Sequence, residues 1–127
     1  MGRLALVTLV IPDYDMAKAF FVDGLGWTCL TDEDQGGGKR WLTVAPGDGG
    51  AALLLARATT GAQIAAIGAQ TGGRVGFFWT TDDFDSDAAR ITAAGGTLLE
   101  TPRDEPYGRV AQWRDPWGNL WDLLTPS

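Results

Sequence analysis

The sequence contains no histidine and a single cysteine, Cys29. The absence of histidine excludes the Ser–His and Cys–His pairs that activate many nucleophiles, and it removes the commonest metal-binding side chain. The two serines, Ser86 and Ser127, therefore lack the usual base, and we expect Cys29 to act as a small hydrophobe in a strand. A lone cysteine excludes an internal disulfide and fits a reducing cytosol, so we expect a cytoplasmic protein.

Long hydrophobic runs are also absent, since none approaches the roughly 18 residues of a membrane-spanning helix. The chain starts with Met1-Gly2-Arg3 and runs into a short, strand-like apolar segment, which predicts neither a signal peptide nor membrane attachment. Basic residues are few, 10 against 16 acidic ones, giving a net charge of −6. This balance argues against nucleic acid as a partner and leaves a cationic ligand open.

An internal repeat organises the 127 residues. Asp13–Asp15 recurs as Asp83–Asp85 and Gly26–Leu30 recurs as Gly96–Glu100, while Arg40 aligns with Arg109 and Ala51–Leu55 with Leu120–Leu124. A repeat of about 70 residues indicates two similar supersecondary units, whose equivalent positions can converge on one pocket. We therefore expect one domain made of a first unit at 1–55, a connector at 56–73 and a second unit at 74–127.

Each unit has the pattern βαβββ. In the first unit the apolar and glycine spacing predicts a strand at 4–10, a helix at 15–22 and strands at 27–31, 40–44 and 51–55. The second unit repeats this order with a strand at 75–80, a helix at 85–94 and strands at 97–100, 110–113 and 119–124. The connector contains one helix-like stretch at 62–69. No helix start follows Gly36–Gly38 and no P-loop lysine pattern completes it, so we interpret it as a turn and not as a phosphate cradle.

Three motifs carry a resemblance to a known family: the segment Val7–Asp15 with Gly24-Leu25-Gly26, the turn Thr81–Phe84, and the segment Asp115–Asp122. With these motifs the sequence resembles the vicinal-oxygen-chelate superfamily, which includes glyoxalases, bleomycin-resistance proteins and extradiol dioxygenases. The resemblance implies an α+β fold in which two βαβββ units form a curled mixed sheet around a cup. It also implies that the protein forms a homodimer.

Metal enzymes of that superfamily hold their ion with residues on the first and last strands of each unit. Matched to this sequence, those positions are Leu6, Leu53, Gly76 and Asp122. Only Asp122 has a donor atom, whereas a catalytic metal site normally needs three suitable protein ligands. We therefore expect neither a metal nor another cofactor.

The alternation of side chains along strands predicts which residues line the cup. If Asp122 faces inward, the same parity brings in Leu120 and Leu124, then Leu6, Thr8 and Val10, then Leu53 and Leu55, and then Gly76, Phe78 and Thr80. Trp41 with Thr43, and Val110 with Gln112, share this inner face. Val7, Leu9, Ala52, Leu54, Phe77, Trp79, Trp121 and Leu123 are expected to pack under the helices. The candidate ligand-binding residues are Trp41, Thr43, Phe78, Thr80, Gln112 and Asp122, with Tyr107, Arg109 and Trp117 at the rim.

Each candidate also has a structural interpretation. Asp122 is either a ligand-binding or proton-transferring group, and as such the candidate catalytic residue, or a carboxylate satisfied within the fold. Trp79, Trp113 and Trp121 are typical core residues, whereas Trp41 and Trp117 are better placed for a pocket. Tyr107 and Arg109 belong either to a surface turn or to a ligand contact.

Three functions remain open. The first is a non-catalytic protein that binds a small organic molecule, cationic or aromatic, in the cup. The second is an enzyme of lyase, isomerase or dioxygenase type with Asp122 as acid, base or metal ligand. The third is an interaction domain without a small-molecule pocket.

Overall fold

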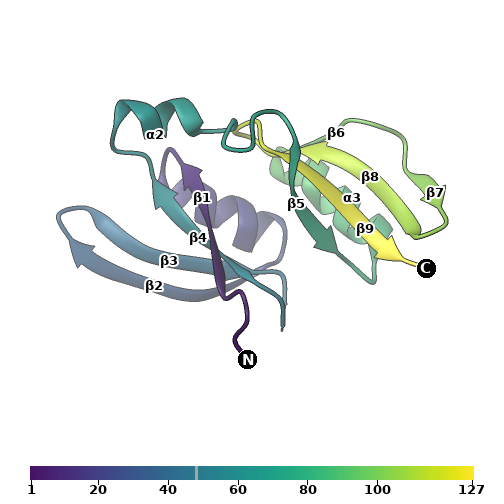
Figure 1. Cartoon of the computed structure of the whole chain (residues 1–127), viewed down its shortest axis with the longest axis horizontal. Helices are drawn as coiled ribbons and strands as arrows, with labels where there is room; N and C mark the ends of the chain where they lie inside the picture. The colour runs from purple at the N-terminus through teal and green to yellow at the C-terminus, as the bar shows by residue number, and fades with distance from the viewer. Residues whose placement is uncertain (48) are drawn as a thin grey trace. The chain divides into compact units, whose positions relative to one another are not determined.

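The computed structural model describes residues 1–47 and 49–127 and divides the chain into two compact units, Met1–Ala66 and Ile67–Ser127 (Figure 1). Asp48, between the strands expected at 40–44 and 51–55, lies outside the described residues. Within the described part of the chain, no helix is both long and apolar enough to cross a membrane.

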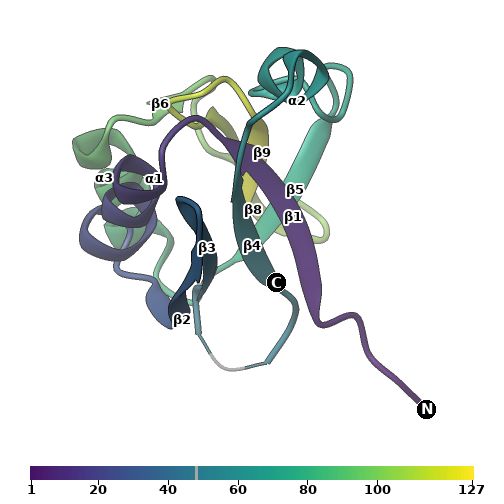
Figure 2. The same cartoon turned by 90° about the vertical axis from the view of Figure 1, so that its left-hand side faces the viewer.

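The first unit is a four-stranded mixed sheet with helices. In chain order it contains β1 (Leu6–Ile11), α1 (Tyr14–Lys18), the π-helical segment η1 (Ala19–Gly24), β2 (Thr28–Gly36), β3 (Lys39–Ala45), β4 (Ala52–Arg57) and α2 (Gly61–Ala66). The strand order is β1-β4-β3-β2, with β1 parallel to β4 and the other pairs antiparallel. Figure 2 shows α1 on one side of β1, β4 and β3.

The second unit repeats this plan. It contains β5 (Val75–Thr80), α3 (Phe84–Ala94), β6 (Thr97–Leu98), β7 (Arg103–Glu105), β8 (Gly108–Arg114) and β9 (Leu120–Pro126). The order is β5-β9-β8-β6, with β5 parallel to β9 and with β7 also paired to β8. The α+β class and the repeated βαβββ order are thus confirmed, with the strands in two mixed sheets, one in each unit. The strand expected at 97–100 is shorter, and the separate strand β7 was not expected.

Equivalent aspartates begin the first helix of each unit. The Asp13 carboxylate accepts a hydrogen bond from the Met16 backbone N–H at 2.8 Å, and Asp83 accepts one from Ser86 at 3.4 Å. Such N-caps satisfy backbone donors that have no partner inside the helix. The aspartates of the repeated motif therefore fix where each helix starts.

The core of the first unit lies on the side of its sheet that faces the helices. Leu9, Leu42, Val44 and Leu55 on the strands are fully buried, as is Phe21 on η1. The expectation that Leu53 and Leu55 lie on the same side as Thr8 is wrong, because Leu55 pairs with Leu9 and Thr8 pairs with Leu54. Directly opposed residues share a face, so a slip of one residue exchanges the two sides of β4. The uninterrupted apolar run of β4 has no polar alternation from which its parity could be read.

In the second unit the parity predicted from the sequence is correct for Phe77–Thr80 and Trp121–Leu124, whereas Gly76 lies at a register irregularity of β5 and does not follow it. Trp113, Trp121 and Leu123 are buried on the side of α3, and the Trp121 ring stacks on Trp113 at 4.9 Å and on Phe77 at 4.7 Å between centroids. Stacked aromatic rings bury large apolar areas and stabilise this core. We call the opposite side of each sheet, turned away from α1 or α3, its far face.

Candidate functional site

The far face of the second sheet brings three of the candidate residues into one row. Phe78 on β5 pairs with Asp122 on β9, and Asp122 pairs with Gln112 on β8. The Phe78 side chain is 64% exposed although it lies on a central part of its strand. An apolar ring beside a carboxylate and an amide is the kind of surface that binds a small organic molecule with a polar group. Thr80 lies on the same face one row further, opposite Leu124.

Asp122 is the polar centre of this row. Among the described residues, none donates a hydrogen bond to its carboxylate, and it forms no ion pair. Partial burial raises the pKa of Asp122 above its ordinary value, the charge of Arg103 lowers it, and the charge of Glu100 raises it. Burial dominates because removing a carboxylate from water disfavours its charged form. The carboxylate can therefore accept a hydrogen bond from a ligand or take up a proton.

Two charged residues beside this row, Glu100 and Arg103, were not identified from the sequence. Glu100 accepts a hydrogen bond from the Gln112 backbone N–H at 2.7 Å and one from Arg103 Nε at 2.9 Å. Arg103 pairs with Val110, which places it on the far face together with Gln112. In the sequence, Glu100 and Arg103 are only two opposite charges three residues apart. Their place beside Asp122 depends on how the segment 99–105 pairs with β8, which that spacing does not indicate.

Two of the residues expected at the rim, Tyr107 and Arg109, lie in different surroundings. Tyr107 is 56% exposed in the turn before β8, and its hydroxyl accepts a hydrogen bond from Arg103 Nη1 at 3.4 Å. Arg109 lies on the helix side of the sheet, where its guanidinium carbon is 5.2 Å from the centroid of the Phe84 ring. Arg109 is therefore on the opposite face of the sheet from Asp122.

Trp117 lies in a turn built by the buried Asp115. One Asp115 oxygen accepts hydrogen bonds from the backbone N–H groups of Trp117 and Asn119, both at 3.0 Å. The other oxygen accepts from Asn119 Nδ2 at 2.8 Å and from Trp121 Nε1 at 3.1 Å. Burial raises the pKa of Asp115, and these hydrogen bonds oppose that shift. The motif Asp115–Asn119 is thus a structural turn that fixes the half-buried Trp117 at the start of β9.

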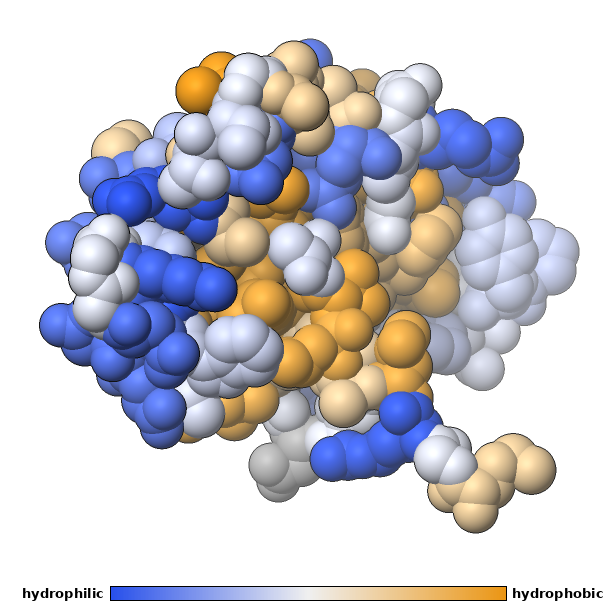
Figure 3. Space-filling model, turned by 60° about the vertical axis from the view of Figure 1, so that its left-hand side comes forward, coloured by the Kyte–Doolittle hydropathy of each residue, from blue (hydrophilic) through white to orange (hydrophobic). Residues whose placement is uncertain are grey.

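The remaining candidates, Trp41 and Thr43, lie on the far face of the first sheet. Thr43 pairs with Leu54, which pairs with Thr8, and the Thr43 and Thr31 hydroxyls share a hydrogen bond of 2.6 Å. Thr43 is 4% exposed, whereas Trp41 is 38% exposed. Figure 3, which brings this unit forward, shows apolar surface at the centre of the view with hydrophilic residues gathered beside it.

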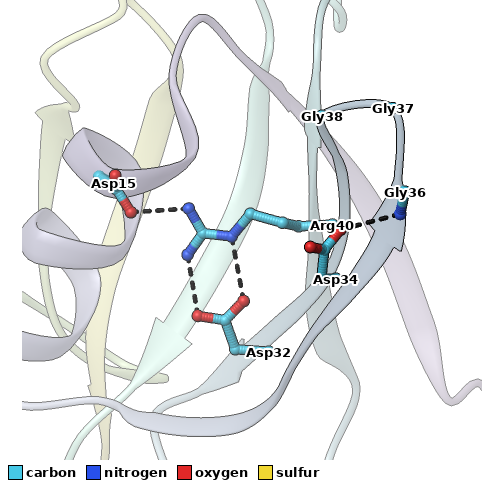
Figure 4. Close-up of a pocket in the computed structure, with 7 residues that line it drawn as sticks. All are labelled: Asp15, Asp32, Asp34, Gly36, Gly37, Gly38 and Arg40. Carbon is cyan, nitrogen blue, oxygen red and sulfur yellow. Dashed lines mark hydrogen bonds and ion pairs between the residues drawn. The ribbon is translucent and has the colours of Figure 1, made fainter.

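A polar hollow in the first unit lies near the β2–β3 turn. It is lined by Asp15, Asp32, Asp34, Gly36, Gly37, Gly38 and Arg40 (Figure 4). Arg40 bonds to Asp32 through Nε at 3.0 Å and Nη2 at 2.8 Å, and to Asp15 through Nη1 at 2.6 Å. Hydrogen bonds from Arg40 and Lys18 lower the pKa of Asp32 to about 2. Arg40 is paired with Asp15 and Asp32, whereas Asp34 accepts a hydrogen bond from the Gly36 backbone N–H at 2.8 Å. The three aspartates of this hollow oppose phosphate binding.

The residues at the metal-ligand positions of the resembled superfamily do not fit a catalytic metal. The register replaces Leu53 by Leu54 as the position equivalent to Asp122, and leucine again offers no donor. Gly76 lies at an irregularity of β5, and a Cβ added there would collide with the methyl group of Thr71. Within the part of the chain that the structure describes, no group of three His, Cys, Asp or Glu residues could hold a metal ion. The residues at these positions therefore lack the donor atoms that a catalytic metal needs, and at Gly76 there is no room for a larger side chain unless Thr71 moves.

Comparison with known proteins gives consistent matches. The family model described as Glyoxalase/Bleomycin resistance protein/Dioxygenase superfamily matches residues 3–123. An uncharacterized protein of Shewanella frigidimarina (strain NCIMB 400) is 44% identical over 120 residues, 93% of this chain and 89% of the relative.

Two solved structures cover almost the whole chain. The crystal structure of UcmS2 has a TM-score of 0.79 at 28% identity and covers 98% of both chains. That of TnmS3, an antibiotic binding protein from Streptomyces sp. CB03234, has a TM-score of 0.77 at 31% identity and covers 100% of this chain and 98% of that chain.

Proposed function

Because the chain belongs to the glyoxalase/bleomycin resistance protein/dioxygenase superfamily, we propose that it binds a small organic molecule and performs no metal catalysis. The far face of the second unit is the proposed binding surface. The observation that carries the proposal is the row in which an exposed Phe78 ring lies next to Asp122, a carboxylate with no hydrogen-bond donor among the described residues.

The chemistry of this row favours a ligand that combines a ring with a donor or cationic group. The ring packs on Phe78, the donor group binds the Asp122 carboxylate, and Gln112 supplies a neutral amide on the other side. The net charge of −6 favours the approach of a cation. The similarity to TnmS3 supports an antibiotic-like ligand, since that protein is described as antibiotic binding.

Three of the other candidate residues, Thr80, Tyr107 and Trp117, keep supporting roles in the proposal as further ligand contacts in the second unit. Trp41 and Thr43 belong to the first unit, and Arg109 lies on the opposite face of its sheet, so we do not assign these three to the binding surface. Leu4 and Trp41, 70% and 38% exposed in the first unit, favour a homodimer that covers them. The lone cysteine favours a cytoplasmic location, and the acidic charge disfavours nucleic acid.

A second candidate function rests on the raised pKa of Asp122. A carboxyl group titrating closer to neutrality can serve as a general acid or base, so the chain could act as a metal-independent lyase or isomerase of the superfamily. Turnover of methylglyoxal with glutathione that disappears in Asp122→Asn would favour this function over binding alone.

Binding is tested by calorimetric titration of the protein with a panel of antibiotics that carry an aromatic ring and an amine. We expect at least one saturable isotherm, unchanged by a chelator, that weakens about tenfold in Asp122→Asn and in Phe78→Ala. Ile64→Ala is the matched control for Phe78→Ala, because Ile64 is 60% exposed on α2. Asp104→Asn is the control for charge, because the Asp104 side chain is 82% exposed. Flat titrations with every compound, or equal weakening by the controls, would contradict the proposal.

A further inference from the structure

The segment between β6 and β8 borders the row of Phe78, Asp122 and Gln112. β6 ends at Leu98 and β7 starts at Arg103, and Pro102 between them has no backbone N–H for the ladder. At this break the Glu100 side chain takes the place of a backbone carbonyl and accepts the Gln112 N–H at 2.7 Å. A carboxylate is thereby fixed to the strand position directly next to Asp122.

Arg103 is held on the same face by acidic partners. Its Nε donates to Glu100 at 2.9 Å, and its Nη1 donates to Glu105 at 2.8 Å. Its partner in the ladder, Val110, pairs in turn with Leu124, two residues from Asp122 on β9. The Arg103 side chain is 42% exposed, so the guanidinium reaches the surface that a ligand would approach.

The charges around Asp122 come from few residues of its own unit. The paired strand β5 carries no ionisable side chain, and β8 contributes Arg114, which pairs with Leu120 on the far face. The segment 99–105 contributes Glu100, Arg103 and Glu105 to this face. The charge of Arg103 lowers the pKa of Asp122 and that of Glu100 raises it, so both are close enough to act on a bound charge.

We infer that Glu100 and Arg103 are specificity-determining residues of this surface, an inference that rests on the proposed function. Arg103 is neutralised by Glu100 and Glu105, which leaves Asp122 as the unpaired charge beside Phe78. The surface therefore selects aromatic ligands that carry a cationic or hydrogen-bond-donating group and rejects those with an acidic group. Glu100 maintains this selectivity because it both anchors and neutralises Arg103.

The first test uses three matched probes, 2-naphthylmethylamine, 2-naphthylmethanol and 2-naphthoate, which differ in charge on one ring system. Their affinities are measured from the amide shifts of Gln112 and Asp122 in ¹H–¹⁵N spectra. We expect the native protein to bind the amine more tightly than the acid. Glu100→Gln should reduce the ratio of amine to acid affinity about threefold to tenfold, and Arg103→Gln should increase it by a similar factor. The affinity for the uncharged alcohol should change by less than about twofold in both variants.

Glu100→Gln is chosen because it retains one of the two hydrogen bonds of Glu100, the one from the Gln112 N–H, and loses the one from Arg103 Nε. The amide oxygen in Glu100→Gln can still accept the Gln112 N–H. Arg90→Gln on α3 is the control for Arg103→Gln, because it also removes one positive charge but on the other side of the sheet, and it should leave the ratio of amine to acid affinity unchanged. An unchanged ratio in Glu100→Gln and Arg103→Gln would overturn the inference while leaving the proposed function intact. If none of the probes binds the native protein, the proposed aromatic ligand is contradicted instead.

A second measurement needs no ligand. The carboxyl carbon of Asp122 is titrated by ¹³C NMR in the native protein and in both variants. Arg103→Gln should move its midpoint to higher pH, because a nearby positive charge stabilises the carboxylate, and Glu100→Gln should move it to lower pH. Shifts in the same direction, or none, would overturn the inference, since a merely structural effect gives no such opposite pair.

Discussion

The guanidinium carbon of Arg40 lies 5.2 Å from the centroid of the Tyr14 ring. In the second unit, Arg109 lies at 5.2 Å from the ring of Phe84, which occupies the same place in the repeated Asp-aromatic-Asp motif. Each unit thus places an arginine over the aromatic ring of the first residue of its helix. The arginine comes from β3 or β8, the third strand in the order of its sheet. The two clusters differ in their ion pairs, which are short for Arg40 and 3.9–4.0 Å long for Arg109.

This difference predicts unequal contributions to stability. Arg40→Gln should lower the free energy of unfolding by about 1–2 kcal/mol, because it removes a bidentate pair with Asp32 and a bond to Asp15. Arg109→Gln should cost less than about 0.5 kcal/mol. Urea unfolding followed by circular dichroism measures both values. Equal losses in the two variants would show that the length of the ion pairs does not set their contribution.

Asp32 makes the first cluster sensitive to acid. Its pKa falls from 3.8 to about 2 in the folded protein, so the unfolded chain binds the proton more tightly. The stabilisation by Asp32 is fully present above pH 3.8 and is lost as the pH falls towards about 2. Thermal unfolding of the native protein and of Asp32→Asn across this range should show melting temperatures that converge at the acid end. A constant difference between the two would contradict the assignment.

Asp115 should be the most sensitive carboxylate for folding. All four hydrogen bonds to its two oxygens come from N–H donors, so the amide nitrogen of Asp115→Asn would face two donors in a buried site. We expect a loss of about 2–4 kcal/mol, because buried donors are left without acceptors. Chemical denaturation provides the measurement, with the exposed Asp104→Asn as a control that should change little. A small effect in both variants would mean that the turn tolerates loss of its charge.

Gly76 should not tolerate a side chain. Gly76→Ala brings a methyl group against Thr71 Cγ2 and should cost about 1–3 kcal/mol through overpacking. Adding Thr71→Ser removes that methyl group, retains a hydroxyl for the bond to the Arg74 carbonyl, and should recover part of the loss. Unfolding measurements on the two single variants and the double variant give the coupling between them. Gly61→Ala, with open space around its position on α2, is the neutral comparison.

Local patterns in the sequence were sufficient for most of the architecture. The helices predicted at 15–22 and 85–94 begin within one residue of the observed starts at Tyr14 and Phe84, and β5 has the bounds that its apolar run indicates. The alternation around Asp122 assigned both faces of β9, because one polar residue in an apolar strand marks the parity. β4 offered no such mark, and its register was decided only by pairing with β1.

The absence of histidine and the identity of four strand residues already determined the poor donor set for a metal, since ligand chemistry depends on residue type alone. The tertiary structure decided which residues share the face of Asp122. Glu100 and Arg103 reach that face because a broken ladder leaves the Gln112 N–H to a side chain, while Arg109 is turned to the side of α3 by the strand period. Such placements depend on pairing between distant segments, and no local pattern encodes them.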